Sequence, residues 1–342
     1  MYRYASVAFD EQIWKRQRRG GISRYFEALS SGLAREGVKV LHANRKGLSK
    51  ANIVHATYYG GRPYRLRSDQ GLVSSLFDMT PERYPEHFVR IGGLRSPHAN
   101  KYGWFAASDE IFSISHSSAD DLSFFMPRLQ ANVRVIPLAT DIDELTTKPI
   151  SGLLGRRFWL LVGKRHGYKN ALTLLRALKL IGNKLRSHEH PLLVFTGGEP
   201  LGRQEKKLLC MHGLTPWVIH IEADDNELAW LYRNTEAVFV PSLAEGFSLP
   251  LIESLACNSP VFASDLEVHR EVAGLYATLL PAVNTVAWAE ALDSCLVSPP
   301  PRPSVQLGNV WKELRGFYAL PRLLSEHQRA YNNLACSKRE IK

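Results

Sequence analysis

The feature that most constrains the fold of this chain is a series of short apolar segments that alternate with segments of helical periodicity. Many of the apolar segments are continuously apolar, which is typical of strands covered by helices on both faces of a parallel sheet. The residues between them carry the spacing of amphipathic helices, as Tyr25, Leu29 and Leu33 do. The chain is therefore expected to adopt an α/β fold with parallel sheets.

The segments fall into two series along the sequence. Strands of the first series are expected at 5–9, 38–43, 52–56, 72–77, 110–115 and 133–137. Strands of the second series are expected at 158–163, 191–197, 217–221, 237–241 and 260–264. Helices are expected at 23–36, 169–182, 224–234, 250–257 and 285–297. The interruption between the two series places a domain boundary near 145–157.

Two domains also follow from the length, because 342 residues exceed the roughly 150 residues of an ordinary domain. We expect two facing Rossmann-like domains with a central cleft, at 1–147 and 148–316. A proline-rich segment at 298–304 precedes a tail at 317–342 that is expected to be helical and to pack back on the first domain. Ligands of such sheets bind at the carboxyl ends of strands, so site residues are sought in the loops that follow strands.

Composition excludes several classes of protein. Hydrophobic residues make up 45% and charged residues 22% of the chain, a globular balance. No apolar run approaches the ~20 residues of a membrane-spanning helix, and the N-terminal residues lack the plan of a secretory signal. We therefore expect a cytoplasmic protein. Four widely spaced cysteines predict neither a zinc site nor a disulfide framework, but reduced thiols: Cys210, Cys257, Cys295 and Cys336.

The net charge of +10 is concentrated at the N-terminal end. Residues 1–70 contain 14 Lys and Arg against 5 Asp and Glu, a difference of +9. Such a surplus favours phosphate groups or an anionic membrane surface as partners, although a solvated basic face without a partner is an alternative. No nucleic-acid partner is expected, because the sequence shows no helix-turn-helix, zinc-finger or RNP-like motif.

Two loops combine features suited to phosphate binding. The first, 18–26, contains Gly20 and Gly21 before an expected helix, where free backbone N–H groups attract anions; an ordinary tight turn is the alternative. The second, 160–170, contains Arg165 and Lys169, whose charges suit phosphate oxygens. The alternative for the second loop is an exposed basic surface.

The stretch AEGFSLPLIESLA at 244–256 carries two glutamates around a turn. Pro250 suits the first turn of a helix, which would place Glu253 in that turn and leave Glu245 in the preceding loop. A carboxylate can accept two hydrogen bonds from a vicinal diol, so one glutamate fits a ribose and the other a hexose. A helix-dipole partner and a solvated loop carboxylate are the alternatives. Together with a phosphate-binding loop, the two glutamates favour a sugar nucleotide as ligand.

The C-terminal half resembles the retaining family 4 glycosyltransferases of GT-B architecture. Their E-x7-E signature matches Glu245 to Glu253, and the similarity extends through 253–274, 162–170 and 224–242. The segments GGISRYF, NIVHATYY and FDMTPERYPEHF resemble the branch that includes bacterial polysaccharide mannosyltransferases. These matches run in order over residues 18–275.

The resemblance implies roles for individual residues. Glu253 would bind the ribose hydroxyls, Glu245 would lie against the donor sugar, and Arg165 and Lys169 would hold the departing phosphates. The remaining donor-binding residues implied are Gly20, Gly21, Gly163, Phe247, Ser248 and Leu249. Asp78 is a further catalytic candidate, and the acceptor-side candidates are His55, Tyr58 and His116.

The sequence departs from the family pattern at three places. Ser248 stands where the family presents glycine, and Asn258 replaces another glycine at a position where asparagine can still adopt a left-handed conformation. Phe77 precedes Asp78 where related sequences have histidine, so the histidine expected near the donor sugar is missing.

The activity implied is retaining transfer of a hexose, with mannose favoured, by front-face substitution without a metal or other cofactor. GDP-mannose is the favoured donor, and UDP- or dTDP-sugars are alternatives. The acceptor implied is a saccharide or a polyprenyl-diphosphate-linked saccharide of lipopolysaccharide or other cell-surface polysaccharide, which would bring the enzyme to the inner face of the membrane as a peripheral protein. A non-catalytic homologue that binds sugar nucleotides is a second hypothesis. A metal site at the D-x-D sequence 141–143 and a nicotinamide-dependent oxidoreductase are disfavoured, the latter because no G-x-G-x-x-G follows the first strand.

Overall fold

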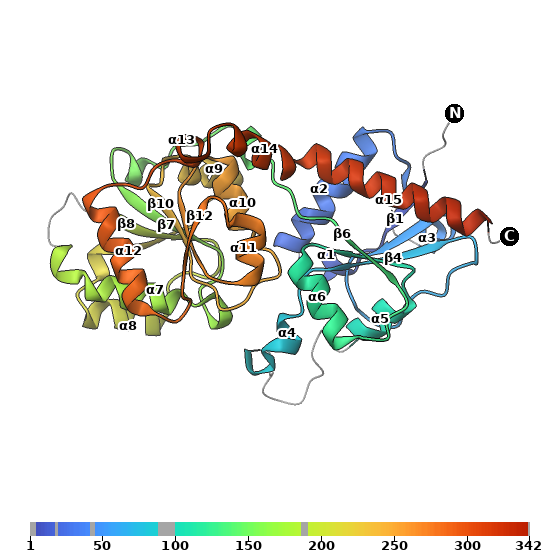
Figure 1. Cartoon of the computed structure of the whole chain (residues 1–342), viewed down its shortest axis with the longest axis horizontal. Coiled ribbons are helices and arrows are strands. Elements are labelled where there is room, and N and C mark those ends of the chain that lie inside the picture. The colour runs from blue at the N-terminus through green and yellow to red at the C-terminus, as the bar shows by residue number, and fades with distance from the viewer. Residues whose placement is uncertain (1–4, 18–19, 42–44, 88–99, 186–190, 341–342) are drawn as a thin grey trace. The chain divides into compact units, whose positions relative to one another are not determined.

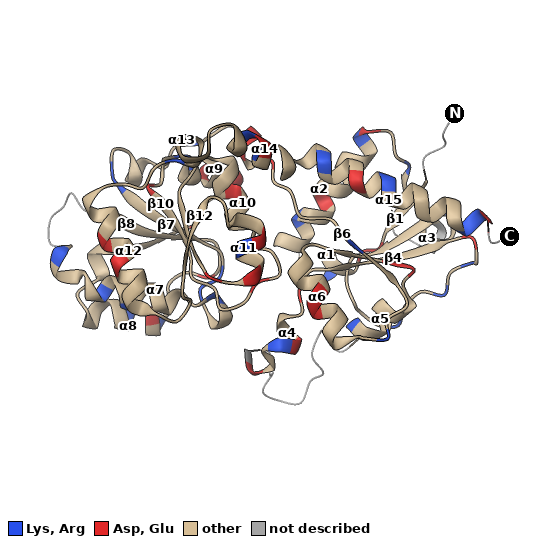
Figure 2. Cartoon of the chain, in the orientation of Figure 1, with Lys and Arg blue, Asp and Glu red and all other residues tan. Residues whose placement is uncertain are grey.

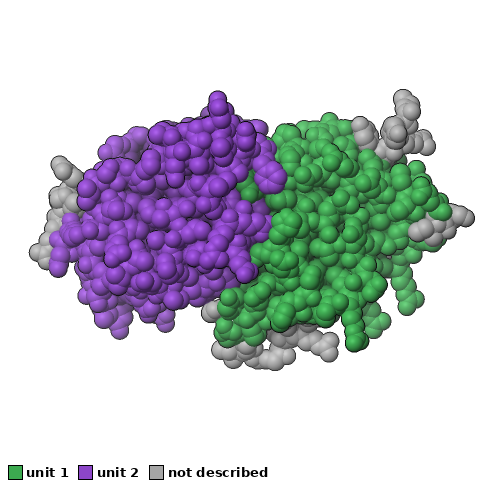
Figure 3. Space-filling view, in the orientation of Figure 1, with its two compact units in different colours: residues 1–139, 318–342 green, residues 140–317 purple. Residues whose placement is uncertain are grey.

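The computed structural model describes residues 5–17, 20–41, 45–87, 100–185 and 191–340. Internal contacts divide the chain into two compact units, shown in different colours in Figure 3. Unit 1 comprises residues 1–139 together with 318–342, and unit 2 comprises residues 140–317. The chain thus leaves unit 1 after one sheet is complete and returns to it for the final helix.

Unit 1 contains a six-stranded sheet with the order β2-β1-β3-β4-β5-β6, and every pairing in it is parallel. Each expected strand of the first series overlaps one observed strand: β1 (Val7–Phe9), β2 (Val40–Leu41), β3 (Ile53–Ala56), β4 (Gly71–Leu76), β5 (Glu110–Ser113) and β6 (Asn132–Val135). The helices are α1 (Gln12–Arg16), α2 (Gly21–Arg35), α3 (Arg45–Lys50), α4 (Thr80–Arg83), α5 (Lys101–Ala107), α6 (His116–Phe125) and α15 (Leu320–Glu340). The last two residues of the expected strand at 38–43 lie outside the described residues.

Unit 2 contains a second parallel sheet with the order β12-β11-β10-β7-β8-β9. Its strands are β7 (Phe158–Val162), β8 (Leu192–Thr196), β9 (Val218–Ile221), β10 (Ala237–Val240), β11 (Val261–Ser264) and β12 (Ala277–Leu280). Its helices are α7 (Ala171–Leu180), α8 (Arg203–Met211), α9 (Asp225–Asn234), α10 (Leu249–Ala256), α11 (Glu267–Ala273), α12 (Thr285–Val297), α13 (Pro303–Leu307) and α14 (Asn309–Phe317). Counted from β7, this is the strand order 3-2-1-4-5-6 that characterises Rossmann folds.

Sequence patterning missed the edge strand β12 and helices α8 and α11. The β12 side chains are only partly buried, so this strand lacks the continuous apolar character of a central strand. The only fully buried side chain of α8 is Leu209, and this leaves almost no helical periodicity for a pattern to detect. Strand β12 and helix α8 contribute few apolar residues to the core, which explains why the hydrophobic pattern did not reveal these two elements.

The core of unit 2 lies between the sheet and helices α7 and α12, which pack side by side (Figure 1). Trp159 on β7 contacts Phe239 on β10 edge to face, with ring centroids 6.0 Å apart. Phe239 in turn stacks on Phe262 of β11 at 5.2 Å. Large aromatic side chains of this kind bury about 150–250 Å² each and dominate the energetics of such a core. They hold the central strands β7, β10 and β11 in register, and the loops that follow these strands are therefore built on a rigid base.

In unit 1 the C-terminal helix α15 packs against α2, β3 and β4, as Figure 1 shows for α2. Gly32 of α2 permits this close approach, because a Cβ atom there would lie 2.7 Å from the side chain of Leu324. The helix also supplies polar contacts within the core. His327 Nδ1 donates to the Leu323 carbonyl, so its Nε2 accepts a hydrogen bond from the Tyr25 hydroxyl at 2.7 Å.

No helix in the described part of the chain combines the length and apolar character needed to cross a membrane.

The buried histidines make the stability of unit 1 dependent on pH. Burial lowers the pKa of His327 to about 4 and that of His55 well below its usual value. Between pH ~6.5 and the lowered pKa, the unfolded chain binds protons that the folded chain does not, so the free energy of unfolding falls as the pH falls. Each such proton contributes up to about 1.4 kcal/mol per pH unit.

We predict that His327→Gln unfolds with a shallower loss of stability between pH 6.5 and 4.5 than the unsubstituted protein. Urea denaturation followed by circular dichroism across this range measures both slopes. Because glutamine does not titrate, the difference between the slopes isolates the contribution of His327 from that of the carboxylates. Parallel slopes would show that His327 binds its proton over the same pH range in the folded and the unfolded protein, which would contradict a lowered pKa.

Candidate functional site

The candidate site lies at the carboxyl edge of the sheet in unit 2, where β7 and β10 are neighbours. The chain runs outward from this pair in opposite directions, to β8 and β9 on one side and to β11 and β12 on the other. Such a switch in strand order leaves a crevice at the carboxyl ends of the two strands, which is the usual ligand position in open α/β sheets. The loops after β7 and β10 contain the residues singled out in the sequence.

The loop after β7 begins with a glycine that the geometry requires. Gly163 has φ +103°, and its N–H donates to the Thr196 carbonyl at 2.8 Å. Gly197 and Gly198, in the turn after β8, lie against it so closely that a Cβ atom on either would come within 3.1–3.3 Å of the Gly163–Lys164 backbone. The sequence Thr196-Gly197-Gly198 was not recognised as part of the site, although a glycine pair directly after a strand is a signal for such a close approach.

The same loop brings Lys169 to Glu245. The Lys169 Nζ atom lies 2.7 Å from Glu245 Oε1 and 2.8 Å from Oε2, and Ser242 Oγ donates to Oε1 at 2.6 Å. Asn170 fixes the loop, because its Nδ2 donates to the Pro241 carbonyl at 2.9 Å at the end of β10. Lys169 retains 27% side-chain exposure against 9% for Glu245. Lys169 and Glu245, which we expected to lie close together, thus form a direct ion pair.

The Glu245 carboxyl is ionised at neutral pH. Its burial acts to raise its pKa, but the charges of Lys169 and His269 and the hydrogen bonds from Lys169 and Ser242 together lower it. A carboxylate with a lowered pKa accepts hydrogen bonds and cannot serve as a proton donor. Glu245 is therefore suited to hold hydroxyl groups and not to act as a general acid.

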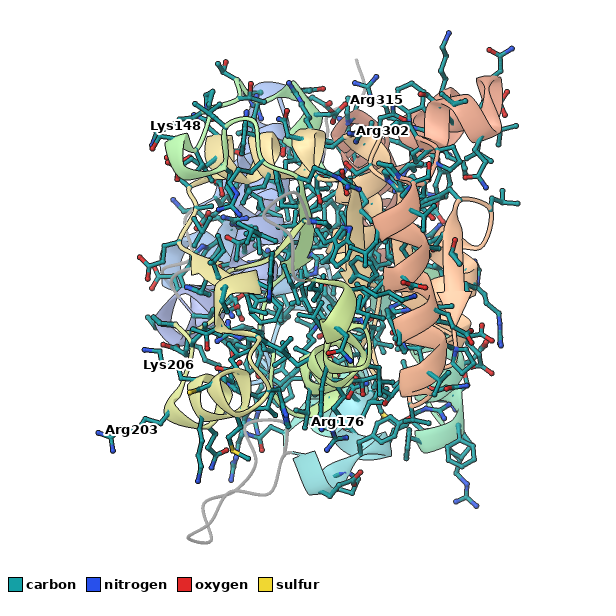
Figure 4. All side chains as sticks on the ribbon, turned by 90° about the vertical axis from the view of Figure 1, so that its left-hand side faces the viewer. Lys148, Arg176, Arg203, Lys206, Arg302 and Arg315 are labelled. Carbon is teal, nitrogen blue, oxygen red and sulfur yellow. The ribbon has the colours of Figure 1, made fainter. Side chains whose placement is uncertain are left out.

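Arg165 is buried, so it does not form the exposed basic surface that was the alternative to phosphate binding for this loop. Its side chain is 1% exposed, and its Nε donates to Glu205 Oε1 at 2.7 Å while Nη2 donates to the Glu199 carbonyl at 2.5 Å. Glu205, on α8, was not singled out in the sequence; burial acts to raise its pKa, but hydrogen bonds from Arg165 and the Gly202 N–H, with the nearby positive charges, lower it. Its neighbours Arg203 and Lys206 project away from the unit (Figure 4). Among the described residues, the Arg165 Nη1 atom is buried without a hydrogen-bond partner.

The turn after β10 leads into α10 through a strained residue. Ser248 precedes the helix with φ +79° and ψ +83°, a conformation that residues other than glycine rarely adopt. Phe247 is buried beside it, and Leu249 is the first helical residue. Asn258, at the other end of the helix, adopts φ +58°, which confirms that it takes the left-handed conformation expected at that position.

Glu253 does not lie in the first turn of α10, which corrects the expectation drawn from Pro250. The helix begins at Leu249, so Glu253 is its fifth residue, and the first turn contains no acidic residue. A helix-dipole role for Glu253 is therefore excluded, since that effect is confined to the first turn. Its Oε2 accepts a hydrogen bond of 2.6 Å from the Tyr232 hydroxyl on α9, and a carboxylate has about four acceptor positions in all.

His269, on α11, is a further polar group of this edge that the sequence did not reveal. Its Nδ1 donates to the Ser264 carbonyl at the end of β11 at 2.7 Å, and its side chain is fully buried. Burial lowers its pKa, although the charge of Glu245 acts to raise it. An isolated histidine in a helix carries no distinctive pattern, so only its place shortly after a strand could have indicated it.

Buried polar atoms without partners gather at this edge. Among the residues described, six buried side-chain nitrogen or oxygen atoms have no hydrogen-bond partner. Two belong to the tryptophans Trp104 and Trp159. The other four follow or end the strands β7, β10 and β11: Arg165 Nη1, Ser248 Oγ, Ser264 Oγ and His269 Nε2. Buried polar groups are normally paired with protein, ordered water or ligand, so these four atoms are candidates for contact with a polar ligand.

The three acceptor-side candidates in unit 1 differ in burial and in their contacts. His55 is fully buried on β3, where its Nδ1 bonds to the Tyr331 hydroxyl at 2.7 Å and its Nε2 to Ser75 Oγ at 2.8 Å. Both ring nitrogens are occupied, so His55 is a core histidine and the expectation of an acceptor contact is wrong. His116 is exposed at the first position of α6, directly after β5. Tyr58 is largely buried beneath the Arg16 guanidinium, which lies 4.8 Å from its ring centroid.

Asp78 and the glycine pair occupy loop positions in unit 1. One carboxylate oxygen of Asp78 accepts from the Thr80 N–H at 2.9 Å, so Asp78 shapes the turn into α4. Gly20 precedes α2 and Gly21 is its first residue, two residues before the expected start of the helix. Gly20 has an extended conformation, and the preceding Arg18 and Arg19 lie outside the described residues. Phe77 packs edge to face on Tyr25 at 5.5 Å and is part of the core.

Asp10 was not singled out in the sequence, yet it organises the carboxyl edge of the unit 1 sheet. Its Oδ1 accepts from the Thr57 N–H at 2.9 Å and from Thr57 Oγ1 at 2.5 Å, and its Oδ2 accepts from Gln12 Nε2 at 2.6 Å. Burial raises the pKa of Asp10, although these hydrogen bonds act to lower it. The carboxylate thereby joins the ends of β1 and β3, the point where the strand order of this sheet reverses.

Charged groups elsewhere are distributed over the surface. Figure 2 shows Lys and Arg on elements of both units, interspersed with Asp and Glu. In the D-x-D sequence, Asp143 pairs with Arg315 of α14, the latter labelled in Figure 4. Within the described ranges, no group of three or more His, Cys, Asp or Glu side chains is arranged to hold a metal ion.

Comparisons with known proteins find a family match within unit 2. Residues 145–306 match the family Glycosyl transferases group 1. The MMP alpha-(1->4)-mannosyltransferase of Mycolicibacterium hassiacum is 30% identical over 168 residues, covering 48% of this chain and 39% of that protein. The O-antigen chain mannosyltransferase RfbU of Salmonella typhimurium is 28% identical over 136 residues, covering 40% and 37%. The D-inositol 3-phosphate glycosyltransferase of Xylanimonas cellulosilytica is 27% identical, covering 72% and 63%. The match thus spans less than two thirds of the length of each relative.

Solved structures give the fold of the whole chain. Sucrose-phosphate synthase from Thermosynechococcus elongatus superposes with a TM-score of 0.75 at 16% identity, covering 97% of this chain and all of that one. Anabaena HepE in complex with UDP and glucose gives a TM-score of 0.70 at 15% identity, with 96% and 100% coverage. Both expected Rossmann-like sheets are confirmed by the two parallel sheets observed. The chain therefore has the GT-B fold, and its residues 145–306 match the glycosyl transferases group 1 family.

Proposed function

We propose that this protein is a retaining, metal-independent glycosyltransferase that uses a nucleotide diphosphate sugar, with the donor bound at the carboxyl edge of the unit 2 sheet. The observation that carries the proposal is the set of unpartnered buried polar atoms at or after the carboxyl ends of β7, β10 and β11. A donor with phosphate and hydroxyl groups supplies both acceptors for Arg165 and donors for His269. The Lys169–Glu245 ion pair lies on two of the same loops.

The charges of the site suit a leaving diphosphate. As the bond from the sugar to the phosphate breaks, negative charge grows on the phosphate oxygens, and fixed cations stabilise that charge. Arg165 Nη1 and the partly exposed Lys169 ammonium are the cations on the β7 loop. Glu245, held as a carboxylate, accepts hydrogen bonds from the hexose. The departing phosphate takes the proton of the acceptor hydroxyl, so the reaction needs no protein base.

Glu253 is assigned to the ribose. Its Oε2 is oriented by the Tyr232 hydroxyl, and a carboxylate can accept two hydrogen bonds from a vicinal diol. Orientation by a neighbouring helix keeps a carboxylate ready for a vicinal diol without loss of side-chain entropy on binding.

Mannose from GDP-mannose is the favoured donor group, since two of the relatives are named mannosyltransferases. UDP- and dTDP-sugars are the alternatives, and one structural neighbour holds UDP and glucose. The acceptor proposed is a saccharide or a polyprenyl-diphosphate-linked saccharide of cell-surface polysaccharide. The +9 charge of residues 1–70 supports an anionic partner such as a lipid-linked diphosphate at the inner face of a membrane.

A non-catalytic protein that binds sugar nucleotides is the second candidate function. Phe77 favours it, because an aromatic ring packed in the core of unit 1 stands where related sequences have histidine. Turnover measurements separate the two candidates, since both require donor binding and only the transferase releases nucleoside diphosphate.

We predict that Lys169→Met lowers kcat for release of GDP from GDP-mannose by about 100-fold, because one cation facing the leaving group is lost. A coupled assay for the nucleoside diphosphate measures the rate. The matched control is Lys184→Met, which breaks an exposed pair with Asp293 of 2.7 Å in the same unit. An undiminished kcat in Lys169→Met, or equal losses in both variants, would contradict the assignment.

A nucleotide-sugar panel tests donor binding directly. We predict that GDP-mannose raises the thermal unfolding midpoint more than UDP-glucose or dTDP-glucose, since ligand at 100-fold excess over Kd stabilises the folded state by about 2.7 kcal/mol. Glu253→Ala should lose most of this shift, whereas Glu290→Ala, an exposed glutamate on α12, should retain it. The ribose assignment fails if Glu253→Ala responds like the unsubstituted protein.

Metal independence has its own test. We predict that EDTA leaves the rate of GDP release unchanged, because the proposed charge stabilisation comes from Arg165, Lys169 and backbone N–H groups. A rate abolished by EDTA and restored by Mn²⁺ would show that a metal ion carries this part of the mechanism.

A further inference from the structure

Ser248 combines two unfavourable features at one position. Its backbone is left-handed, with φ +79°, a conformation that is costly for a residue with a Cβ atom. Its hydroxyl is buried, with the residue 6% exposed, and has no hydrogen-bond partner among the described residues. Glycine would avoid both costs. The free protein therefore does not explain the serine at this position, and we look for a partner of its hydroxyl in a bound ligand.

The hydroxyl does not serve the ordinary purpose of a serine before a helix. Serine there usually accepts a hydrogen bond from the second or third helical N–H. In α10 the second residue is Pro250, which has no N–H, and the N–H of Leu251 donates to the Ser248 carbonyl at 3.1 Å. The start of α10 thus lacks one backbone donor, while a buried hydroxyl lies beside it.

We propose that Ser248 is a donor-binding residue whose hydroxyl donates a hydrogen bond to a phosphate oxygen of the bound nucleoside diphosphate. The proposal rests on the proposed function, since it assigns a contact within the same site. The positive end of the α10 dipole favours an anion at this point. The hydroxyl replaces a donor that Pro250 removes, and it becomes paired only when the ligand is bound.

The choice of phosphate over sugar follows from the surroundings. Ser248 lies between the β10 loop that carries Glu245 and the first turn of α10, which contains no acidic residue. A phosphate oxygen is an acceptor only, so it matches a hydroxyl whose proton has no other acceptor. A contact to the sugar would instead depend on the hexose and disappear when the nucleoside diphosphate binds alone.

The test compares the affinity of GDP, with UDP as a second probe, for the unsubstituted protein and Ser248→Ala by isothermal titration calorimetry. Ser248→Ala keeps the Cβ atom and removes only the hydroxyl. We expect its Kd for the diphosphate that binds to rise at least about tenfold, as for loss of a hydrogen bond to a charged group. Without ligand, its urea midpoint should be no lower than that of the unsubstituted protein, because the hydroxyl has no partner to lose.

Ser254→Ala is the matched control on the same helix. Ser254 is also buried, but its hydroxyl donates to the Pro250 carbonyl at 2.6 Å. We expect the opposite result for it: a lower urea midpoint and an unchanged Kd. Ser248→Gly should weaken binding as Ser248→Ala does, and it separates the hydroxyl from the backbone strain.

The outcomes distinguish this inference from the proposed function. An unchanged Kd in Ser248→Ala and Ser248→Gly overturns the role of Ser248 and leaves donor binding intact. A loss seen only with GDP-mannose and not with GDP assigns the contact to the sugar and also overturns the inference. If neither GDP nor UDP binds the unsubstituted protein, the proposed function and the inference fall together.

Discussion

The ion pair between Lys169 and Glu245 joins the two loops on which the candidate site depends. It links the end of β7 to the end of β10, the neighbouring strands from which the sheet of unit 2 runs in both directions. Removing two charges from water costs several kcal/mol for each ion, so a partly buried pair stabilises a fold poorly by comparison with apolar packing. The aromatic core beneath it, with Trp159, Phe239 and Phe262, supplies the rigidity. A pair of this kind, placed on that base, is better explained by ligand binding than by stability.

Several polar side chains of the candidate site in unit 2 are held in place by hydrogen bonds within the protein. Arg165 is fixed by Glu205 and the Glu199 carbonyl, and this leaves one guanidinium nitrogen unpartnered within the described structure. Glu253 is oriented by Tyr232 in the same way. Side chains held by such contacts lose little entropy when a ligand binds. Preorganised charge of this kind is also what stabilises a leaving group most effectively.

The sequence predicts the fold well where strands are central and continuously apolar. All eleven expected strands overlap an observed strand, whereas the partly exposed edge strand β12 was not predicted. For the candidate site, the sequence singled out several of the residues but did not predict their hydrogen-bond partners. Glu205, His269 and Asp10 could not be found, because a single ionisable residue on a helix or after a strand carries no pattern. The burial of His55 was also unforeseeable, since it depends on Tyr331 from the C-terminal helix, 276 residues away in sequence.

The most direct test of the central claim is a crystal structure of the protein with bound GDP-mannose. We predict that the diphosphate lies at the carboxyl ends of β7 and β10, within hydrogen-bonding distance of Lys169 Nζ and Arg165 Nη1, with the ribose at Glu253. A nucleotide bound elsewhere on the chain, or at this edge with Arg165, Lys169 and Glu253 all out of contact, would contradict the claim.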